Sequence, residues 1–201
     1  MNSIAYPIKD ALYLNITNRC TNECQFCIRN KTRKFDGQHE LWLDKEPSVK
    51  EILAAIGDPT KYKQIVFCGY GEPLLRLDVV KQVAKKLKAQ GARVVIDTNG
   101  HANLHWGRNI LPELKGLVDM ISISLDAENA KVYEKICQPA YGPAAYPAVI
   151  EFIKEAKKHI PEVEASIVDL PMVDHAACRK IAKELAVGFR VRSYYEERYV
   201  K

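Results

Sequence analysis

The chain has 201 residues, which is enough for one domain with a single large hydrophobic core, and we predict one domain over residues 1–201. Apolar residues make up 47% and charged residues 27% of the sequence, a globular composition that excludes intrinsic disorder. The net charge of +5 is mild, and most lysines fall on amphipathic segments, so the charge indicates a solvated surface.

Neither a leader nor a membrane segment is expected from the sequence. The N-terminal residues Met1 to Pro7 are too few and too mixed in character for a signal peptide. The longest uncharged run, Gln138 to Ile150, falls short of the ~18 apolar residues that span a bilayer. We therefore expect a soluble, cytoplasmic protein. In that compartment the six cysteines are expected to be free thiols or metal ligands rather than disulfides.

The first predicted strand covers residues 11–17, where apolar and polar side chains alternate. Leu12, Leu14 and Ile16 are expected to pack on a helical layer, while the intervening polar side chains face a polar interior. In α/β enzymes the loop after such a strand is a usual place for catalytic residues. We therefore expect functional residues immediately after residue 17.

Three cysteines follow in a loop over residues 18–30, with the spacing C-x-x-x-C-x-x-C: Cys20, Cys24 and Cys27. A structural zinc site usually takes four protein ligands, and no fourth cysteine is near in the sequence. An iron–sulfur cluster held by three thiolates would leave one iron open to a substrate or cofactor. The alternatives are a zinc knuckle completed by His39 and three unrelated thiols.

A long segment, residues 28–46, separates these cysteines from the next helix. Long loops without regular structure are usually functional or mobile. Two interpretations are open: a lid over the site, or a surface excursion with Trp42 packed into the core. Ser48 and Glu51 then form a capping box, which predicts a helix over residues 47–56.

A second strand, residues 64–68, is followed by the turn Gly69-Tyr70-Gly71-Glu72-Pro73 and a helix over residues 77–90. Glycines between a strand and a helix let the backbone approach a ligand closely. Taken alone, the motif is also consistent with a simple turn.

Further strands are predicted at residues 93–100, 120–126, 163–168 and 189–194, with helical segments between them. Six alternations of strand and helix require a parallel sheet with right-handed crossovers. A closed eight-unit barrel needs about 250 residues, or ~31 per unit, so this chain has room for six units. We predict an α/β fold, an open partial (β/α)6 TIM-like barrel with its site at the C-terminal ends of the strands. Asp126, the last residue of the fourth strand, is also explained as the N-cap of the next helix.

These motifs together resemble those of the radical S-adenosylmethionine (SAM) superfamily. The cysteine spacing, with Phe26 before the last cysteine, resembles the cluster-binding signature. The Gly-Tyr-Gly-Glu turn resembles the motif that holds the SAM amino group, although Tyr70 splits the usual glycine pair. More narrowly, residues 13–29, residues 67–76 and His101-Ala-Asn resemble the radical SAM proteins associated with TatD-family nucleases.

The resemblance implies an enzyme that uses a 4Fe–4S cluster, bound by the three cysteines, to cleave SAM reductively. The resulting 5′-deoxyadenosyl radical would abstract hydrogen from a substrate, and a flavodoxin- or ferredoxin-type protein would donate the electron. Phe26 would border the adenine, and the turn would bind the ammonium. The implied SAM-binding residues are Phe26, Gly69, Tyr70, Gly71, Glu72, Asp97, Asn99 and Ser124 (the last three near the ribose) and Arg192 (at the carboxylate).

The substrate is expected to be large, anionic or presented by a partner, because six units leave a lateral gap in the barrel. Four basic residues of segment 28–46 favour a nucleotide or nucleic acid: Arg29, Lys31, Arg33 and Lys34. The competing view is that Trp42 and Tyr70 close over a small molecule. Two other classes stay open, a glycyl-radical-type activating enzyme acting on a partner protein and a zinc-binding nucleic-acid-binding module.

The remaining candidate residues have simpler explanations. Cys68, Cys137 and Cys178 are expected to be packed thiols. His101 and His105 follow the third strand and are expected to be exposed loop residues, with substrate contact as the alternative.

Overall fold

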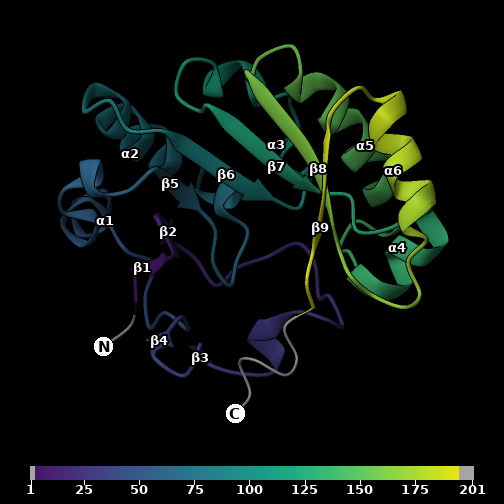
Figure 1. Cartoon of the computed structure of the whole chain (residues 1–201), viewed down its shortest axis with the longest axis horizontal. Helices are drawn as coiled ribbons and strands as arrows, with labels where there is room; N and C mark the ends of the chain where they lie inside the picture. The colour runs from purple at the N-terminus through teal and green to yellow at the C-terminus, as the bar shows by residue number, and fades with distance from the viewer. Residues whose placement is uncertain (1–2, 195–201) are drawn as a thin grey trace.

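The computed structural model describes residues 3–194, which form one seven-stranded sheet with helices along one face (Figure 1). The strand order is β1-β2-β5-β6-β7-β8-β9. Strand β1 is antiparallel to β2, and each later neighbour is parallel to the one before it. The strands are β1 (Ala5–Ile8), β2 (Ala11–Leu14), β5 (Gln64–Phe67), β6 (Val94–Thr98), β7 (Met120–Ser124), β8 (Glu162–Val168) and β9 (Gly188–Arg192).

Helices connect the parallel strands and pack on the outer face of the sheet. They are α1 (Val49–Ile56), α2 (Leu77–Ala89), α3 (Ala102–Trp106), α4 (Ala130–Cys137), α5 (Ala145–Ala156) and α6 (His175–Glu184). Among the described residues, six parallel strands form a sheet with an open edge at each side, which confirms the predicted partial barrel. Strand β1 was not predicted; it is an edge strand, where Pro7 costs no ladder hydrogen bond.

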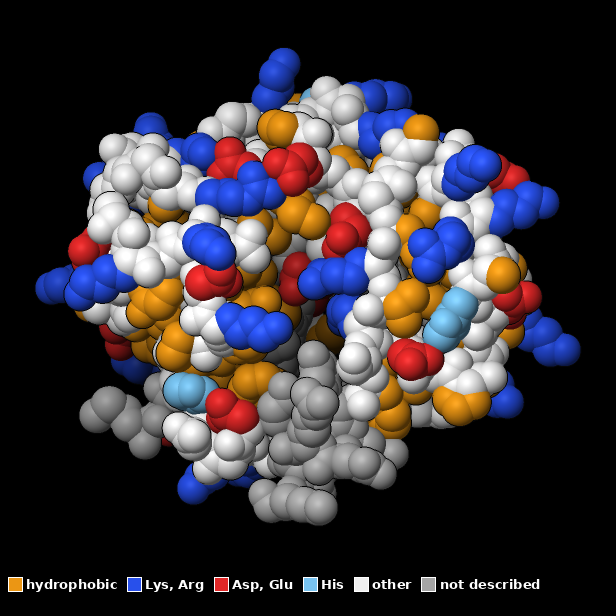
Figure 2. Space-filling model, viewed as in Figure 1, with side chains coloured by type: hydrophobic (Ala, Val, Ile, Leu, Met, Phe, Trp, Pro, Cys, Tyr) orange, Lys and Arg blue, Asp and Glu red, His pale blue; other side chains and the backbone are white. Residues whose placement is uncertain are grey.

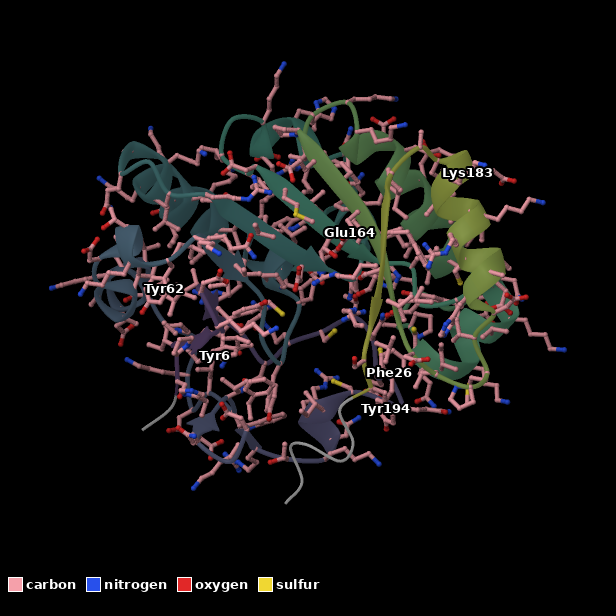
Figure 3. All side chains as sticks on the ribbon, viewed as in Figure 1. Tyr6, Phe26, Tyr62, Glu164, Lys183 and Tyr194 are labelled. Carbon is pink, nitrogen blue, oxygen red and sulfur yellow. The ribbon has the colours of Figure 1, made fainter. Side chains whose placement is uncertain are left out.

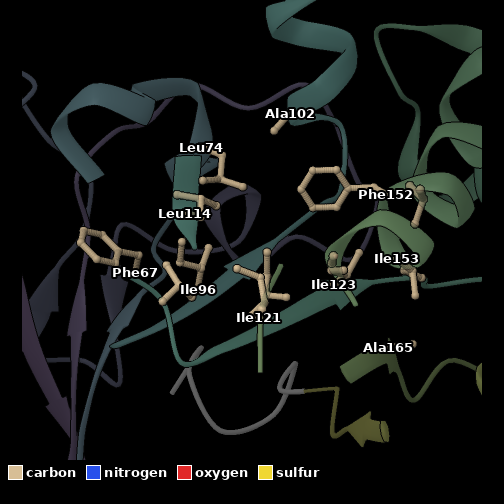
Figure 4. Close-up of a cluster of buried hydrophobic side chains, with 14 of the residues drawn as sticks. Phe67, Leu74, Ile96, Ala102, Leu114, Ile121, Ile123, Phe152, Ile153 and Ala165 are labelled. Carbon is tan, nitrogen blue, oxygen red and sulfur yellow. The ribbon is translucent and has the colours of Figure 1, made fainter. Parts of the chain in front are cut away.

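The core lies between the sheet and the helices because alternate strand residues point outward (Figure 4). Phe67 and Ile96 pack there with Phe152 of α5, and all three are at most 1% exposed. The opposite, inner face carries a small apolar cluster of Ala11, Val66 and Val95, and polar side chains such as Ser122 and Glu164. Because the main core lies on the outer face, the inner face can hold a polar ligand without loss of that core.

Segment 28–46 is anchored to the barrel and has structure of its own. It contains a short hairpin of β3 (Lys34–Phe35) and β4 (His39–Glu40). The interpretation that Trp42 packs into the core is wrong: Trp42 is 36% exposed, whereas Leu41 and Leu43 on either side are buried. Side chains after β2 hold the segment, because Asn15 Nδ2 donates to Leu41 O at 2.7 Å and Asn18 Nδ2 donates to Leu43 O at 2.7 Å.

None of the helices in residues 3–194 has both the length and the apolar character that crossing a bilayer requires.

Candidate functional site

The predicted site residues gather at the C-terminal ends of the parallel strands. The cysteine loop (residues 18–30) follows β2, and the Gly-Tyr-Gly-Glu turn follows β5. Asn99 follows β6, while Ser124 and Arg192 end β7 and β9. The parallel topology puts all of these ends at one edge of the sheet, which is the arrangement that the sequence predicted.

The three loop cysteines are half-buried free thiols. The sulfur of Cys20 accepts hydrogen bonds from Asn22 N at 3.4 Å and from Asn99 Nδ2 at 3.7 Å. Burial raises the pKa of Cys20 to about 12, and it also raises the pKa of Cys27. Cys20 and Cys27 are therefore protonated until a metal displaces their protons.

The glycines of the Gly-Tyr-Gly-Glu turn are required by the chain's own packing. A Cβ at Gly71 would lie 2.4 Å from Thr17 O and 2.5 Å from Arg19 O, closer than atoms can approach. A Cβ at Gly69 would meet Asn15 at 2.3 Å. The turn thus packs directly against the start of the cysteine loop. The sequence predicted that these glycines give space to a ligand; in the structure they leave room for the backbone and side chain that precede the cysteines.

Glu72 is buried and joins three parts of the site. Its Oε1 accepts from Leu74 N at 3.0 Å and from Thr98 Oγ1 at 2.8 Å, and its Oε2 accepts from Asn99 N at 2.7 Å. Its backbone N–H donates to Arg19 O at 2.8 Å. Burial raises the pKa of Glu72, while these donors act in the opposite direction. Because each carboxylate oxygen has two lone pairs, Oε2 retains the capacity to accept another donor.

Tyr70 and Phe26 lie at the margins of this site. The Tyr70 hydroxyl donates to Thr32 O at 2.5 Å, and its ring lies 6.4 Å from that of Trp42, so it joins segment 28–46 to the turn. Phe26 is half-buried against the hydrophobic core, on the same loop as the cysteines. Figure 3 labels Phe26 and shows its side chain on this loop.

Arg192 ends the last strand and faces the inner side of the sheet. Its Nη2 donates to Asp126 Oδ1 at 3.0 Å and to Ser124 Oγ at 3.0 Å. Its Nε is buried and has no hydrogen-bond partner within residues 3–194. This ion pair is not a surface salt bridge, since Asp126 is only 4% exposed. The assignment of Asp126 as a helix cap is also wrong: Asn129 caps α4 by accepting from Val132 N.

A second group of polar side chains lies on the inner face of the sheet, on strands β6 to β9. The sequence analysis did not predict that these side chains form one group. Glu164 of β8 accepts from Arg190 Nε at 2.8 Å and from Ser122 Oγ at 3.0 Å. Asp97 lies 3.9 Å from Arg190, and Cys68 is its neighbour across strands β5 and β6. Burial raises the pKa of both Asp97 and Cys68. The charged residue Glu164 within strand β8 was the sequence signal for this group.

His101 lies in a buried network beneath the cysteine loop and is only 1% exposed, so the expectation of an exposed loop residue is wrong. Its ring nitrogens contact Thr21 Oγ1 and Tyr133 OH, each at 3.1 Å. Asn99 Nδ2 donates to Thr21 Oγ1 at 2.8 Å, and Asn22 Nδ2 donates to Tyr133 OH at 3.2 Å. The network therefore positions the loop. Substrate contact by His101 is not supported by this geometry.

We expect His101 to make the protein sensitive to acid. Burial lowers the pKa of His101 to about 4, below the ordinary 6.5, so the ring is neutral in the folded state. Stability from this neutral ring is complete above pH ~6.5 and is lost as pH falls towards 4, by about 3 kcal/mol in total. Urea titrations at several pH values should show that the free energy of unfolding depends less steeply on pH in His101→Gln than in the wild type. The exposed His105→Gln should retain the wild-type slope, and equal slopes in all three proteins would contradict the assignment.

Comparison with known proteins identifies the family. The sequence pattern of the Radical SAM superfamily matches residues 14–185. The chain belongs to the radical SAM superfamily. As a radical SAM chain it carries the partial barrel of that enzyme type, and membership implies a 4Fe–4S cluster, SAM and an electron donor.

Relatives of this radical SAM chain have varied names. It is 27% identical to a protein of Methanocaldococcus jannaschii named as a probable GTP 3′,8-cyclase, over 92% of this chain and 62% of that protein. It is 26% identical to a protein of the same organism named for glycyl-radical enzyme activation, over 100% of this chain and 82% of that protein. Streptococcus suis SuiB bound to its precursor peptide SuiA has the same fold, with a TM-score of 0.70 at 14% identity, over 96% of this chain and 42% of SuiB.

The chain spans about half the length of the first curated relatives that it matches: 52% of an uncharacterized Methanocaldococcus jannaschii protein and 37% of a Lactiplantibacillus plantarum GTP 3′,8-cyclase. The comparisons therefore establish the type of domain, and the reaction has to be inferred from the residues of the site.

The residues at the strand ends fit the implied cofactors. Cys20 already accepts two N–H bonds at sulfur, as ligand sulfurs in iron–sulfur proteins do. The unpartnered Nε of Arg192 is a buried donor suited to a carboxylate. Within residues 3–194 no three Cys, His, Asp or Glu side chains converge on the position of one metal ion. Each cysteine of a 4Fe–4S site binds a different iron, so such convergence is not required of it.

The zinc-knuckle alternative has less support. His39 lies in β4, where its ring is 5.8 Å from that of Tyr6 and its Nε2 is 3.8 Å from Asp36. In the part of the chain that the structure describes, it forms no metal-binding group with the cysteines.

Proposed function

We propose that this chain is the core domain of a radical SAM enzyme in which Cys20, Cys24 and Cys27 bind a 4Fe–4S cluster and SAM binds beside them. The observation that carries the proposal is the link that Asn99 makes between the cysteine loop and the Gly-Tyr-Gly-Glu turn. Asn99 contacts the Cys20 sulfur with its side chain and Glu72 with its backbone N–H. One residue thus fixes a cluster ligand relative to the proposed ammonium site.

The chain's own residues would bind and orient the cofactor. Glu72 Oε2 accepts from the SAM ammonium, and Arg192 Nε donates to the SAM carboxylate. Asp97 or Ser124 accepts from a ribose hydroxyl, and Phe26 borders the adenine. When bound, the cluster would supply the electron for reductive cleavage of SAM. A flavodoxin- or ferredoxin-type protein would supply that electron from outside the chain.

We further propose that the substrate is large or presented by a partner, because the sheet is open at both edges. Two of the basic residues of segment 28–46 that we expected to favour an anionic substrate make contacts within the chain. Arg29 donates to Asn18 O and Asn22 O, and Arg33 lies over the Trp42 ring, so both have structural contacts. On the face shown in Figure 2, Lys and Arg side chains are scattered rather than gathered in one stripe. A nucleic-acid substrate is therefore less favoured than a protein or peptide.

A second candidate is a glycyl-radical-type activating enzyme that acts on a partner protein. Its support is the similarity over 100% of this chain to a protein named for that activity. The narrower relation to TatD-associated radical SAM proteins is a proposal that rests on the sequence motifs alone. Release of 5′-deoxyadenosine that requires a protein partner would favour the activating enzyme.

The central experiment is anaerobic reconstitution with iron and sulfide, followed by a SAM-cleavage assay with dithionite. We expect a brown protein with about four irons per chain and measurable 5′-deoxyadenosine. Stoichiometric zinc, no visible absorbance and no SAM cleavage would overturn the proposed function.

Glu72→Gln should weaken SAM binding while the cluster remains. Gln keeps the shape of the side chain but places an NH2 group where a carboxylate oxygen accepts. Loss of a charged hydrogen bond costs roughly 1.5–3 kcal/mol, or about tenfold to a hundredfold in Kd. Because Asn99 N also donates to this oxygen, the variant should be less stable as well. Thr98→Val, which removes a different donor to Glu72, is the matched control. Equal SAM affinity in Glu72→Gln and wild type would refute the role.

A further inference from the structure

A fourth thiol lies beside the cysteine loop and comes from a distant part of the sequence. Cys137 is the last residue of α4 and is fully buried in the hydrophobic core. Backbone hydrogen bonds from the residues on either side of Cys24 reach the carbonyls of Ile136 and Cys137, so the two cysteines are neighbours. Cys24 itself is only half-buried and packs against the same core. The expectation that Cys137 is a packed thiol is confirmed, but its neighbour is a proposed cluster ligand.

Two backbone hydrogen bonds hold this contact in register. Glu23 N donates to Cys137 O at 3.0 Å, and Gln25 N donates to Ile136 O at 2.9 Å. These bonds flank Cys24 on both sides. The last carbonyls of a helix have no partner within the helix, so the loop satisfies two acceptors of α4 that would otherwise be buried without donors. The position of Cys24 is therefore determined by the end of α4.

We propose that Cys137 is a positioning residue for the cluster, whose S–H donates a hydrogen bond to the sulfur of Cys24. This inference rests on the proposed function. Hydrogen bonds to ligand sulfurs are among the determinants of the reduction potential, because they stabilise negative charge on the cluster. The thiol of Cys137 would favour the reduced cluster and fix the direction of one ligand. Its place in the core, behind a half-buried Cys24, indicates a donor rather than a fourth ligand.

The test compares Cys137→Ala, which removes the donor, with Cys137→Ser, which keeps an O–H donor in a similar position. The full chain is reconstituted anaerobically, and iron and sulfide content and the midpoint potential are measured by EPR-monitored titration. Cys178→Ala is the control, since Cys178 is equally buried in α6. We expect full iron content in all three variants. The midpoint potential should be more negative in Cys137→Ala and unchanged in Cys178→Ala. In Cys137→Ser it should equal the wild-type value or be slightly higher.

The outcomes separate this inference from the proposed function. If Cys137→Ala keeps the wild-type potential, the inference is wrong and the function stands. If it loses iron as completely as Cys24→Ala, then Cys137 is a ligand and the inference is also wrong. If the Ala variant does not fold, the exchangeable S–H proton remains measurable in the wild type by ENDOR in H2O and D2O, and its absence near the cluster would refute the bond. If the wild-type protein binds no cluster after reconstitution, both the inference about Cys137 and the proposed function are wrong.

Discussion

Replacement of Cys20, Cys24 or Cys27 by Ala, one at a time, is expected to abolish the brown chromophore of the reconstituted protein. Each thiolate is proposed to bind a different iron, and none of the three can be replaced by another cysteine of the loop. Loss should be nearly complete in each variant, as measured by visible absorbance and by iron and sulfide content.

The matched controls are Cys68→Ala and Cys178→Ala. Cys68 lies on the inner face beside Asp97, and Cys178 is buried in α6, so neither is expected to bind iron. A full cluster in Cys24→Ala would reject the ligand assignment. Complete loss in Cys178→Ala, with the fold intact by circular dichroism, would show that the ligand set is wrong.

Gly71→Ala is expected to cause the largest loss of stability among single methyl additions. Its Cβ would overlap the carbonyl oxygens of Thr17 and Arg19, and both are backbone atoms that cannot move independently. Overpacking of this kind costs about 1–3 kcal/mol or more, and here it should also displace the cysteine loop. Urea denaturation gives the free energy of unfolding, and iron uptake reports on the loop.

Gly188→Ala is the control for this prediction. A Cβ at Gly188 would lie 3.5 Å from Val163 O, an ordinary contact, and the residue is in the edge strand β9. Its effect on the free energy of unfolding should be within about 0.5 kcal/mol, typical of surface substitutions. If Gly71→Ala and Gly188→Ala are equally stable, then the close contact of the turn with the cysteine loop is absent in solution.

The local features of the fold could be predicted because their signals lie within a few residues. The capping box is one case: Ser48 N donates to Glu51 Oε2 at 2.8 Å, and Glu51 N donates to Ser48 Oγ at 3.3 Å. The alternation of residues 11–17 also predicted correctly that Leu12 and Leu14 enter the core. Parallel topology then explains why separate strand ends meet at one edge.

Other features could not be predicted because the neighbouring sequence did not distinguish between two possible arrangements. Asp126 and Asn129 are both good N-caps, and only the position of Arg192 reveals that Asp126 is used for an ion pair. In Leu41-Trp42-Leu43, three apolar residues in a row carry no periodicity, so the sequence could not indicate that the tryptophan points outward. His101 was misjudged because both of its buried partners are distant in sequence.

The anchoring of the cysteine loop has a consequence for the order of folding. Its side-chain hydrogen bonds to Asn99, His101 and Tyr133 span sequence separations of 79, 80 and 111 residues. Closing contacts of such separation requires the intervening strands and helices to have assembled first. In zinc fingers, by contrast, the metal itself drives the chain to fold. We therefore expect this polypeptide to complete its barrel before iron enters, so that cluster assembly is the last step of its maturation and acts only on chains that have already folded.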